Sequence, residues 1–155
     1  MKMNRFVSLL IVGVVACSGL AYGQSDTEKE VKQAVLETWE YRNANLKDYV
    51  DGASKHGTLT FWSNGGLLNE AAPGLPPDEY EVHNVQPKHI KVITLVENQA
   101  AVALYYLEGS LKPKGTPLVS NYLTRVTAVF VKEDGKWKVR SGHWSSLTGG
   151  SGTSR

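Results

Sequence analysis

The spacing of apolar and polar residues divides the chain into a helical first part and a longer second part made of strands. Over residues 31–42, apolar and aromatic side chains recur at three- and four-residue steps, which predicts one amphipathic helix that ends near Asn43. Residues 25–28 (SDTE) and residues 27–30 (TEKE) each offer a capping box for the start of this helix. Asn45 can cap a second, shorter helix, for which Gly57 provides the stop signal.

The second part predicts a sheet. Residues 58–62 (TLTFW) form a short β-rich run, and residues 67–84, with their prolines, glycines and acids, are typical of a loop. Alternating segments then predict two hairpins, of which the first joins residues 89–96 to 100–109 and the second joins residues 119–132 to 136–146. Helices followed by antiparallel strands indicate an α+β fold in which the helices cover one face of the sheet.

The pairing register of the last hairpin depends on its turn. A three-residue turn with Gly135 in the bulge position places Val131 opposite Trp137 and Arg125 opposite His143. A two-residue turn at residues 134–135 shifts the pairing by one residue and mixes the two faces. We favour the first register because it collects the charged side chains on one face. That face then also exposes several apolar side chains, which a second subunit would cover in a dimer: Tyr122, Val126, Phe130 and Trp144.

Residues 1–23 have the features of an export signal. A positively charged start precedes an apolar run over residues 6–16, which is shorter than the about 20 apolar residues that a membrane-spanning helix needs. Ala21 and Gly23 fit the small residues of a cleavage site before Gln24. In the alternative, the residues that end at Cys17 form a lipoprotein signal, and a lipid on Cys17 tethers the domain to a membrane. We therefore expect an exported protein, either periplasmic or secreted.

Composition narrows the classes of function. The length of 155 residues suggests one domain over residues 24–147, followed by a Gly/Ser-rich tail over residues 148–155 that we expect to be disordered. Of the 17 basic residues, Lys2 and Arg5 lie in the export segment, which leaves 15 basic and 15 acidic side chains in the mature chain. A neutral domain lacks the positive field that nucleic acids require. The single cysteine, Cys17, lies in the export segment, so the mature domain has no thiol for a disulfide or a cysteine nucleophile.

The closing hairpin carries a more specific pattern. Residues 125–145 contain Arg-x-Thr, an apolar strand, Asp-Gly-x-Trp and finally His-x-Ser. This pattern resembles the closing hairpin of SnoaL-like proteins in the nuclear transport factor 2-like superfamily, and the order of the earlier elements agrees over residues 27–147. The resemblance implies a cone-shaped, strongly curved antiparallel sheet wrapped around the N-terminal helices. It also implies a homodimer formed through the sheet and a ligand pocket at the wide end of the cone.

The resemblance does not imply a single activity, because the superfamily contains isomerases, dehydratases, hydrolases, cyclases and non-enzymatic binders. The strand carboxylate of ketosteroid isomerase-like members is missing, since residues 56–62 contain no acid. The Asp-Arg-Asp relay of limonene epoxide hydrolase-like members has no strand aspartate beside Arg125. The histidines and tyrosines of scytalone dehydratase-like members are matched only by His143 and Tyr106.

The expected site lies in the mouth of the cone. Trp39, Trp62 and Tyr106 would form its apolar walls, and Arg125 and His143 its polar end. His143 is the candidate general base, and Arg125 could hold an anionic group of the ligand. Each of these residues also has a purely structural interpretation. His143 could form a hydrogen bond that links the last strand to its neighbour, and an acidic side chain could neutralise Arg125. The aromatic residues could simply belong to the core.

We therefore expect a small, mainly apolar organic ligand in this pocket and no cofactor. His83 and His89 are six residues apart with no third His or Cys nearby, so we expect no metal site. The alternatives are a cofactor-free isomerase, dehydratase or cyclase with His143 as general base, and a non-catalytic dimeric interaction scaffold. We expect no nucleic acid partner, and contact with a membrane only if Cys17 is lipidated.

Overall fold

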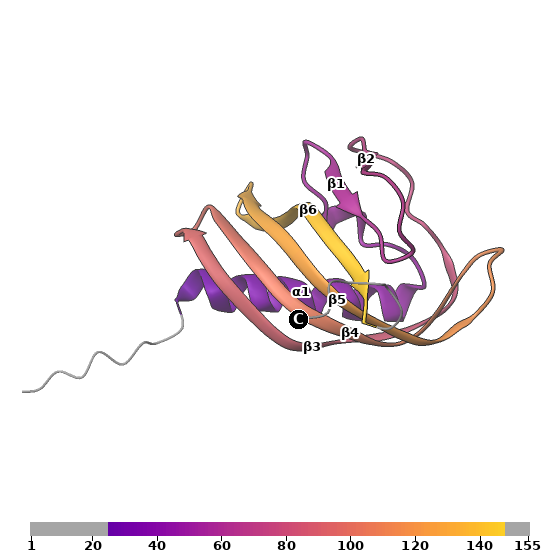
Figure 1. The fold of residues 1–155 in the computed structure, drawn as a ribbon. Helices are drawn as coiled ribbons and strands as arrows, with labels where there is room; N and C mark the ends of the chain where they lie inside the picture. Colours follow the sequence, from indigo (N-terminus) through magenta and orange to yellow (C-terminus); the bar gives the residue numbers. More distant parts are fainter. Residues whose placement is uncertain (1–24, 148–155) are drawn as a thin grey trace, which may run out of the picture.

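The computed structural model describes residues 25–147, which form one α-helix and a six-stranded sheet. The helix α1 (Asp26–Asn45) lies across one face of the sheet (Figure 1). A single 3₁₀ turn, η1 (Val50–Gly52), follows it. The predicted second helix is therefore wrong, because Asn45 is the last residue of α1 and does not cap a new helix. The predicted export signal, including Cys17, and the predicted tail at residues 148–155 lie outside the described residues.

The sheet is mixed and curved. Its strands are β1 (Thr58–Phe61), β2 (Asn69–Ala71), β3 (Tyr80–Val96), β4 (Ala100–Pro113), β5 (Val119–Glu133) and β6 (Lys136–Ser146), in the order β2-β1-β6-β5-β4-β3. All neighbouring strands pair antiparallel except β1 and β6, which pair parallel. This arrangement confirms the α+β, cone-like architecture expected from the sequence.

The ends and the buried face of α1 follow from its sequence. The Ser25 hydroxyl accepts a hydrogen bond from the Glu28 N–H (3.2 Å), and Leu46 ends the helix in the left-handed conformation. Val31, Val35 and Trp39 are spaced four residues apart and are buried in the core. Because such positions share one face of a helix, this stripe packs α1 against the sheet.

The segment predicted as a loop, residues 67–84, contains β2 and the first residues of β3. Strand β3 begins at Tyr80 and continues through Pro87, whereas the sequence predicted a start at His89. A proline is tolerated here because β3 is an edge strand, on which one side of the backbone needs no partner. His89 has a φ of 53° and lies where the pairing register shifts, so the strand has a bulge at this point.

A glycine allows β3 and β4 to approach closely where the sheet curls. Gly109 has a φ of 150°, and a Cβ at this position would lie 1.9 Å from the carbonyl oxygen of Asn84 on the neighbouring strand. The pairing of β4 with β5 also shifts just after Gly109. Any other residue here would force the two backbones apart.

The last hairpin has the two-residue turn, so the favoured three-residue register is wrong. Asp134 and Gly135 both have positive φ, and Glu133 pairs with Lys136 across the turn. Two consecutive residues with positive φ match the turn type whose twist suits a hairpin. Further along, Arg125 pairs with Ser145 and not with His143.

A β-bulge at Arg140 decides which side chains of β6 face the helix. Val129 pairs with Ser141 and Phe130 pairs with Val139, which leaves Arg140 as the extra residue. One extra residue moves every later side chain to the other face of a strand. The buried side chains of β5 and β6 are accordingly Thr124, Val126, Ala128, Phe130, Trp137 and Trp144. The expected outer position of Val126, Phe130 and Trp144 is therefore wrong, because the core of a single chain buries them.

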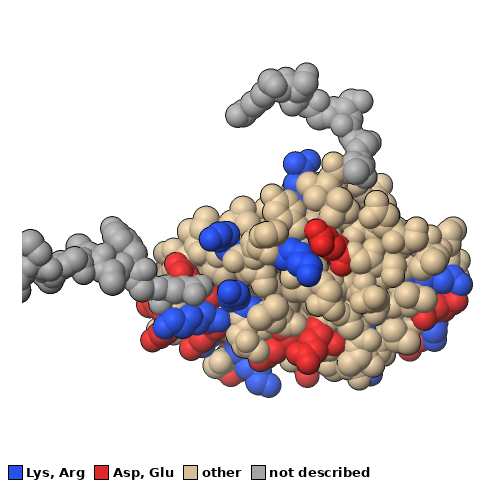
Figure 2. All heavy atoms as spheres, turned by 90° about the horizontal axis from the view of Figure 1, so that it is seen from below, with Lys and Arg blue, Asp and Glu red and all other residues tan. Residues whose placement is uncertain are grey.

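Charged side chains of both signs gather where α1 begins, and a few more of both signs lie near the middle of the face seen from below (Figure 2). No helix within residues 25–147 combines the length and the apolar character needed to cross a membrane.

Candidate functional site

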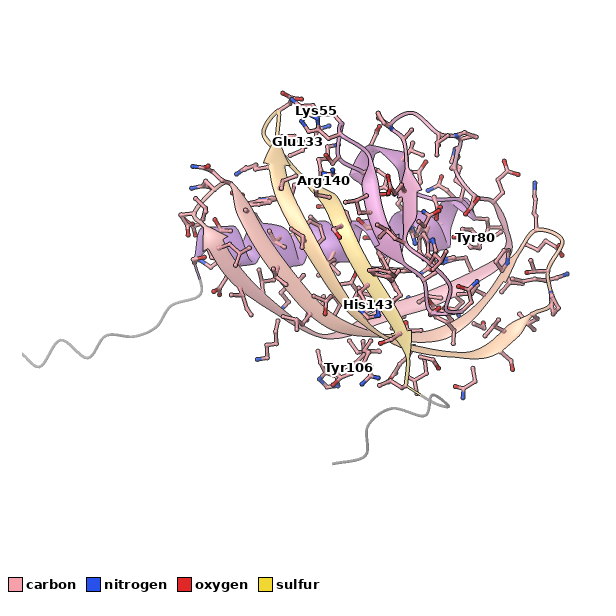
Figure 3. The ribbon with its side chains drawn as sticks, turned by 45° about the horizontal axis from the view of Figure 1, so that its top comes forward. Lys55, Tyr80, Tyr106, Glu133, Arg140 and His143 are labelled. Atoms are coloured by element: carbon pink, nitrogen blue, oxygen red, sulfur yellow. The ribbon has the colours of Figure 1, made fainter. Side chains whose placement is uncertain are left out.

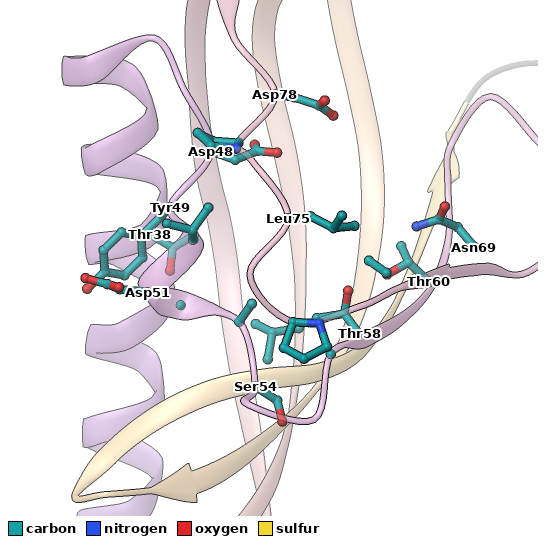
Figure 4. A pocket seen from close by; sticks show the side chains of 18 of the residues that line it. Thr38, Asp48, Tyr49, Asp51, Ser54, Thr58, Thr60, Asn69, Leu75 and Asp78 are labelled. Carbon is teal, nitrogen blue, oxygen red and sulfur yellow. The ribbon is translucent and has the colours of Figure 1, made fainter.

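A cavity of about 610 Å³ lies between α1 and the residues that precede β3. Its walls come from the second half of α1, η1 and the residues after it, β1, residues 69–78, and the face of β4–β6 that α1 covers. Figure 4 shows Thr38 and Tyr49 on one side of this cavity and Thr60 and Asn69 on the other. Segments from five parts of the chain therefore meet around one concave site.

Aromatic side chains form much of the cavity wall. Trp39 extends from α1, Tyr105 from β4, and Trp62 follows the end of β1. The rings of Trp62 and Trp144 stack with their centres 5.0 Å apart. Gly142 leaves the space for this arrangement, because a Cβ there would lie 2.3 Å from the Trp144 ring. Large, flat, apolar walls of this kind are typical of sites for organic molecules.

The polar end of the cavity contains an ion pair and its neighbours. Arg42 Nη2 lies 3.2 Å from Asp48 Oδ1, and the Tyr80 hydroxyl donates to the same carboxylate oxygen (2.9 Å). The Arg42 guanidinium lies 4.8 Å from the centre of the Trp39 ring. The Asp48 N–H donates to the carbonyl oxygen of Asp78 (2.9 Å), so the two aspartates lie side by side (Figure 4). This end therefore offers charged and hydrogen-bonding groups within an otherwise aromatic site.

Burial keeps several neighbouring side chains neutral. His83 is only 5% exposed, and burial together with the Arg42 charge lowers its pKa to about 4. His83 Nδ1 lies 2.7 Å from Asn43 Oδ1, which can only accept, so Nδ1 carries the proton. Burial raises the pKa of Tyr105 to about 12 and also raises that of Tyr80. Neither the histidine nor the tyrosines therefore add charge to the polar end at neutral pH.

The wall after η1 is fixed to the turn between β5 and β6. The Ser54 hydroxyl donates to Glu133 Oε1 (2.7 Å), and the Lys55 N–H donates to Glu133 Oε2 (2.8 Å). Figure 3 shows Lys55 and Glu133 together at this end of the sheet. These bonds lower the pKa of Glu133 against the opposing effect of burial, which is the largest influence on this carboxyl. The carboxylate thus positions the residues that lead into β1.

The chain matches no protein-family model and no curated protein sequence. Its structure is nevertheless similar to solved structures. One is a candidate dehydratase of the NTF2-like family from Streptomyces avermitilis, with 16% sequence identity, a TM-score of 0.59, and coverage of 79% of this chain and 97% of that chain. The chain has the nuclear transport factor 2-like (NTF2-like) fold. An NTF2-like protein of unknown function from Prochlorococcus marinus is also similar, with 22% identity, a TM-score of 0.54, and coverage of 82% of this chain and 97% of that chain.

A third solved structure carries a different description. The CamKII hub homology domain of Chlamydomonas reinhardtii has 20% identity and a TM-score of 0.55 to this NTF2-like domain, with 77% of this chain and 98% of that chain covered. Because identities are this low, the likeness shows the fold alone. The function must therefore be argued from the cavity.

The structure divides the five predicted site residues of the NTF2-like domain between two faces of the sheet. Trp39 and Trp62 line the cavity. Tyr106, Arg125 and His143 lie on the opposite, convex face and are not among the lining residues. The expectation that these three side chains lie in the cavity is wrong.

The position of Arg125 and His143 results from the register of the last hairpin. Arg125 Nε donates to the Ser145 hydroxyl (2.9 Å), and the His143 ring lies 5.7 Å from the Phe61 ring. Residues that alternate with the buried positions of β5 and β6 must point outward. His143 therefore lies too far round the sheet to act as a base inside the cavity.

Tyr105 and Tyr106 show the same effect on β4. Tyr105 is buried and lines the cavity, whereas Tyr106 is exposed and points away from the sheet (Figure 3). Its nearest ring is that of His89, with the ring centres 6.1 Å apart. The sequence predicts that these two tyrosines alternate, but not which of them faces the helix.

The polar end of the cavity was not predicted from the sequence, although the position of Arg42 indicated part of it. Arg42 follows Trp39 by three residues and shares its helix face, so it could have been placed in the site. Asp48 lies in a segment without hydrophobic periodicity, and Tyr80 follows another such segment. The sequence therefore did not indicate that either residue belongs to the site. Within residues 25–147, no three His, Cys, Asp or Glu side chains come together in an arrangement that could hold a metal ion.

Proposed function

We propose that residues 24–147 form an exported SnoaL-like domain that binds a small, mainly apolar organic molecule in the cavity beside α1. The observation that supports this proposal is the aromatic cavity of about 610 Å³ with one polar end. Ligand pockets generally have volumes of about 300–1,000 Å³, apolar walls and a few polar groups that orient the ligand. Trp39, Tyr105 and Trp62 would contact the apolar part of the molecule, and Arg42 and Asp48 would orient its polar group.

Binding can be tested with the neutral fluorescent probe N-phenyl-1-naphthylamine. We expect saturable binding with one probe per chain, seen as an increase in probe fluorescence and as quenching of tryptophan. Trp62→Ala should weaken binding about tenfold, because a stacking partner of the probe is lost. The control is Leu67→Ala, since Leu67 is an exposed apolar residue that neither lines the cavity nor belongs to the proposed dimer interface. Equal effects of the two substitutions, or no binding at all, would contradict the proposal.

The proposal includes a homodimer formed through the convex face of the sheet. The supporting observation is a group of large apolar side chains exposed on strands of the sheet: Phe61, Ile93, Leu104 and Tyr106. A second copy that covers them would remove this apolar area from water.

Native mass spectrometry of the protein purified from its own host tests export, assembly and occupancy together. We expect a dimer of chains that begin at Gln24 and carry a co-purified small molecule. A chain that retains residues 1–23 would refute cleavage, and a lipid mass on Cys17 would show the lipoprotein alternative. A monomer in dilute solution would refute the dimer.

A cofactor-free enzyme is the second candidate, with a base other than His143. The observation that favours it is Asp78, which lines the cavity beside Asp48 and whose carboxylate makes no hydrogen bond or ion pair within residues 25–147. A free carboxylate can remove a proton from a bound molecule, and Arg42 could stabilise the negative charge that develops. If the wild type converts the co-purified molecule, Asp78→Asn should abolish turnover and leave probe affinity unchanged. Unchanged turnover would exclude Asp78 as the base.

A further inference from the structure

We propose that residues 72–77, which we call the strap, act as a gate over the cavity, with Leu75 as the side chain that covers a bound molecule. The proposal rests on the proposed function, because a gate has meaning only if the cavity takes a ligand. It adds the route by which the ligand enters and the side chain that controls its release.

The strap belongs to the longest continuous stretch of the cavity lining. Every residue from position 69 to position 78 lines the cavity, so this segment forms one complete wall. Ala72 to Pro76 are also all exposed to solvent. A ligand that leaves through this wall must therefore pass the strap.

The hydrogen bonds that hold the strap lie at its ends. Before it, Ala71 pairs with Thr58 across β2 and β1. After it, the Asp78 carbonyl oxygen accepts from the Asp48 N–H (2.9 Å), and the Tyr80 N–H donates to the Leu46 carbonyl oxygen (2.8 Å). These anchors fix both ends of the strap to elements that do not need to move.

Between the anchors, no residue of the strap makes a hydrogen bond within residues 25–147. Three of its residues are prolines, which have no N–H to donate. Gly74 has a φ of 78° with open space around it, so the backbone can change direction there without a clash. A segment with fixed ends and no internal bonds can open at low cost in free energy.

The Leu75 side chain of the strap points into the cavity. Figure 4 shows it between the aspartates of the polar end and the threonines of β1. It is 53% exposed, which leaves about half of an apolar side chain in contact with water. A molecule that fills the cavity would cover this area, and the same contact would hold the strap closed.

The kinetic test compares Leu75→Ala with Leu67→Ala by stopped-flow fluorescence of N-phenyl-1-naphthylamine. Leu67 is 93% exposed on the preceding turn and does not line the cavity, so it serves as the matched control. We expect Leu75→Ala to raise the dissociation rate by about five- to tenfold, because the covering contact is lost. Leu67→Ala should leave the rate within about twofold of the wild type.

Hydrogen exchange gives a second, independent measurement on the unmodified protein. The N–H groups of Ala72, Gly74 and Leu75 should exchange freely without the probe and become protected when it binds. Equal dissociation rates for the two variants, or unprotected strap amides in a saturated complex, would overturn the gate and leave the binding function intact. Absence of probe binding to the wild type would instead overturn the proposed function, and the gate with it.

Discussion

The substitution Gly142→Ala tests whether the wall of the cavity is packed as the structure shows. A Cβ at position 142 would lie 2.3 and 2.4 Å from two carbons of the Trp144 ring. That ring cannot simply turn away, because it stacks on Trp62 at 5.0 Å and is only slightly exposed. The added methyl group must therefore displace the stacked pair.

The expected cost combines two effects. Overpacking a well-packed site costs about 1–3 kcal/mol, whereas alanine in a strand gains about 0.5–1 kcal/mol over glycine. The net loss in free energy of unfolding should be about 1–2 kcal/mol. The displaced wall should also weaken binding of N-phenyl-1-naphthylamine.

A double-mutant cycle measured by urea unfolding isolates the clash. Trp144→Leu removes the ring atoms that the new methyl group meets, so in that background Gly142→Ala should keep only the gain of about 0.5–1 kcal/mol from replacing a strand glycine. Gly115→Ala is the control, because Gly115 has a φ of 74° and a Cβ added there would meet no atom within 4 Å. Its cost should be the same with Trp144 and with Leu at position 144. An equal cost of Gly142→Ala in both backgrounds would refute this packing of the wall.

Three further predictions concern the polar end and the convex face. Burial lowers the pKa of His83 from 6.5 in the unfolded chain to about 4 in the folded chain, so only the unfolded chain binds this proton between the two pH values. The free energy of unfolding should therefore fall by on the order of 3 kcal/mol as the pH drops across this window, and His83→Gln should flatten the urea-midpoint profile. Asn43→Ala removes the amide that bonds both backbone groups of Val85 and should cost about 2 kcal/mol by urea unfolding; an unchanged midpoint would contradict this role. Leu104→Glu should convert the proposed dimer to a monomer in light scattering, whereas the control Leu67→Glu should not. A dimer in both variants would show that Leu104 is not part of the dimer interface.

The sequence alone determined the elements that depend on local chemistry. Ser25 and the spacing of Val31, Val35 and Trp39 defined α1, because capping and side-chain periodicity act within a few residues. The two hairpins followed from alternation and turn residues in the same way. The resemblance of the last hairpin also led to the fold that the structural comparisons support.

The tertiary structure decided which residues form the site. Alternation states which side chains of a strand share a face, but only packing against α1 selects the buried face, as Tyr105 and Tyr106 show. The single extra residue at Arg140 reverses the alternation within β6, and no local signal marks it. Arg42 and Asp48 come together through a chain reversal after α1, and Tyr80 joins them from a separate strand. Such long-range contacts depend on the curved sheet. The sequence therefore predicted the main secondary-structure elements and the fold of this protein, whereas only the tertiary structure showed which residues form its cavity.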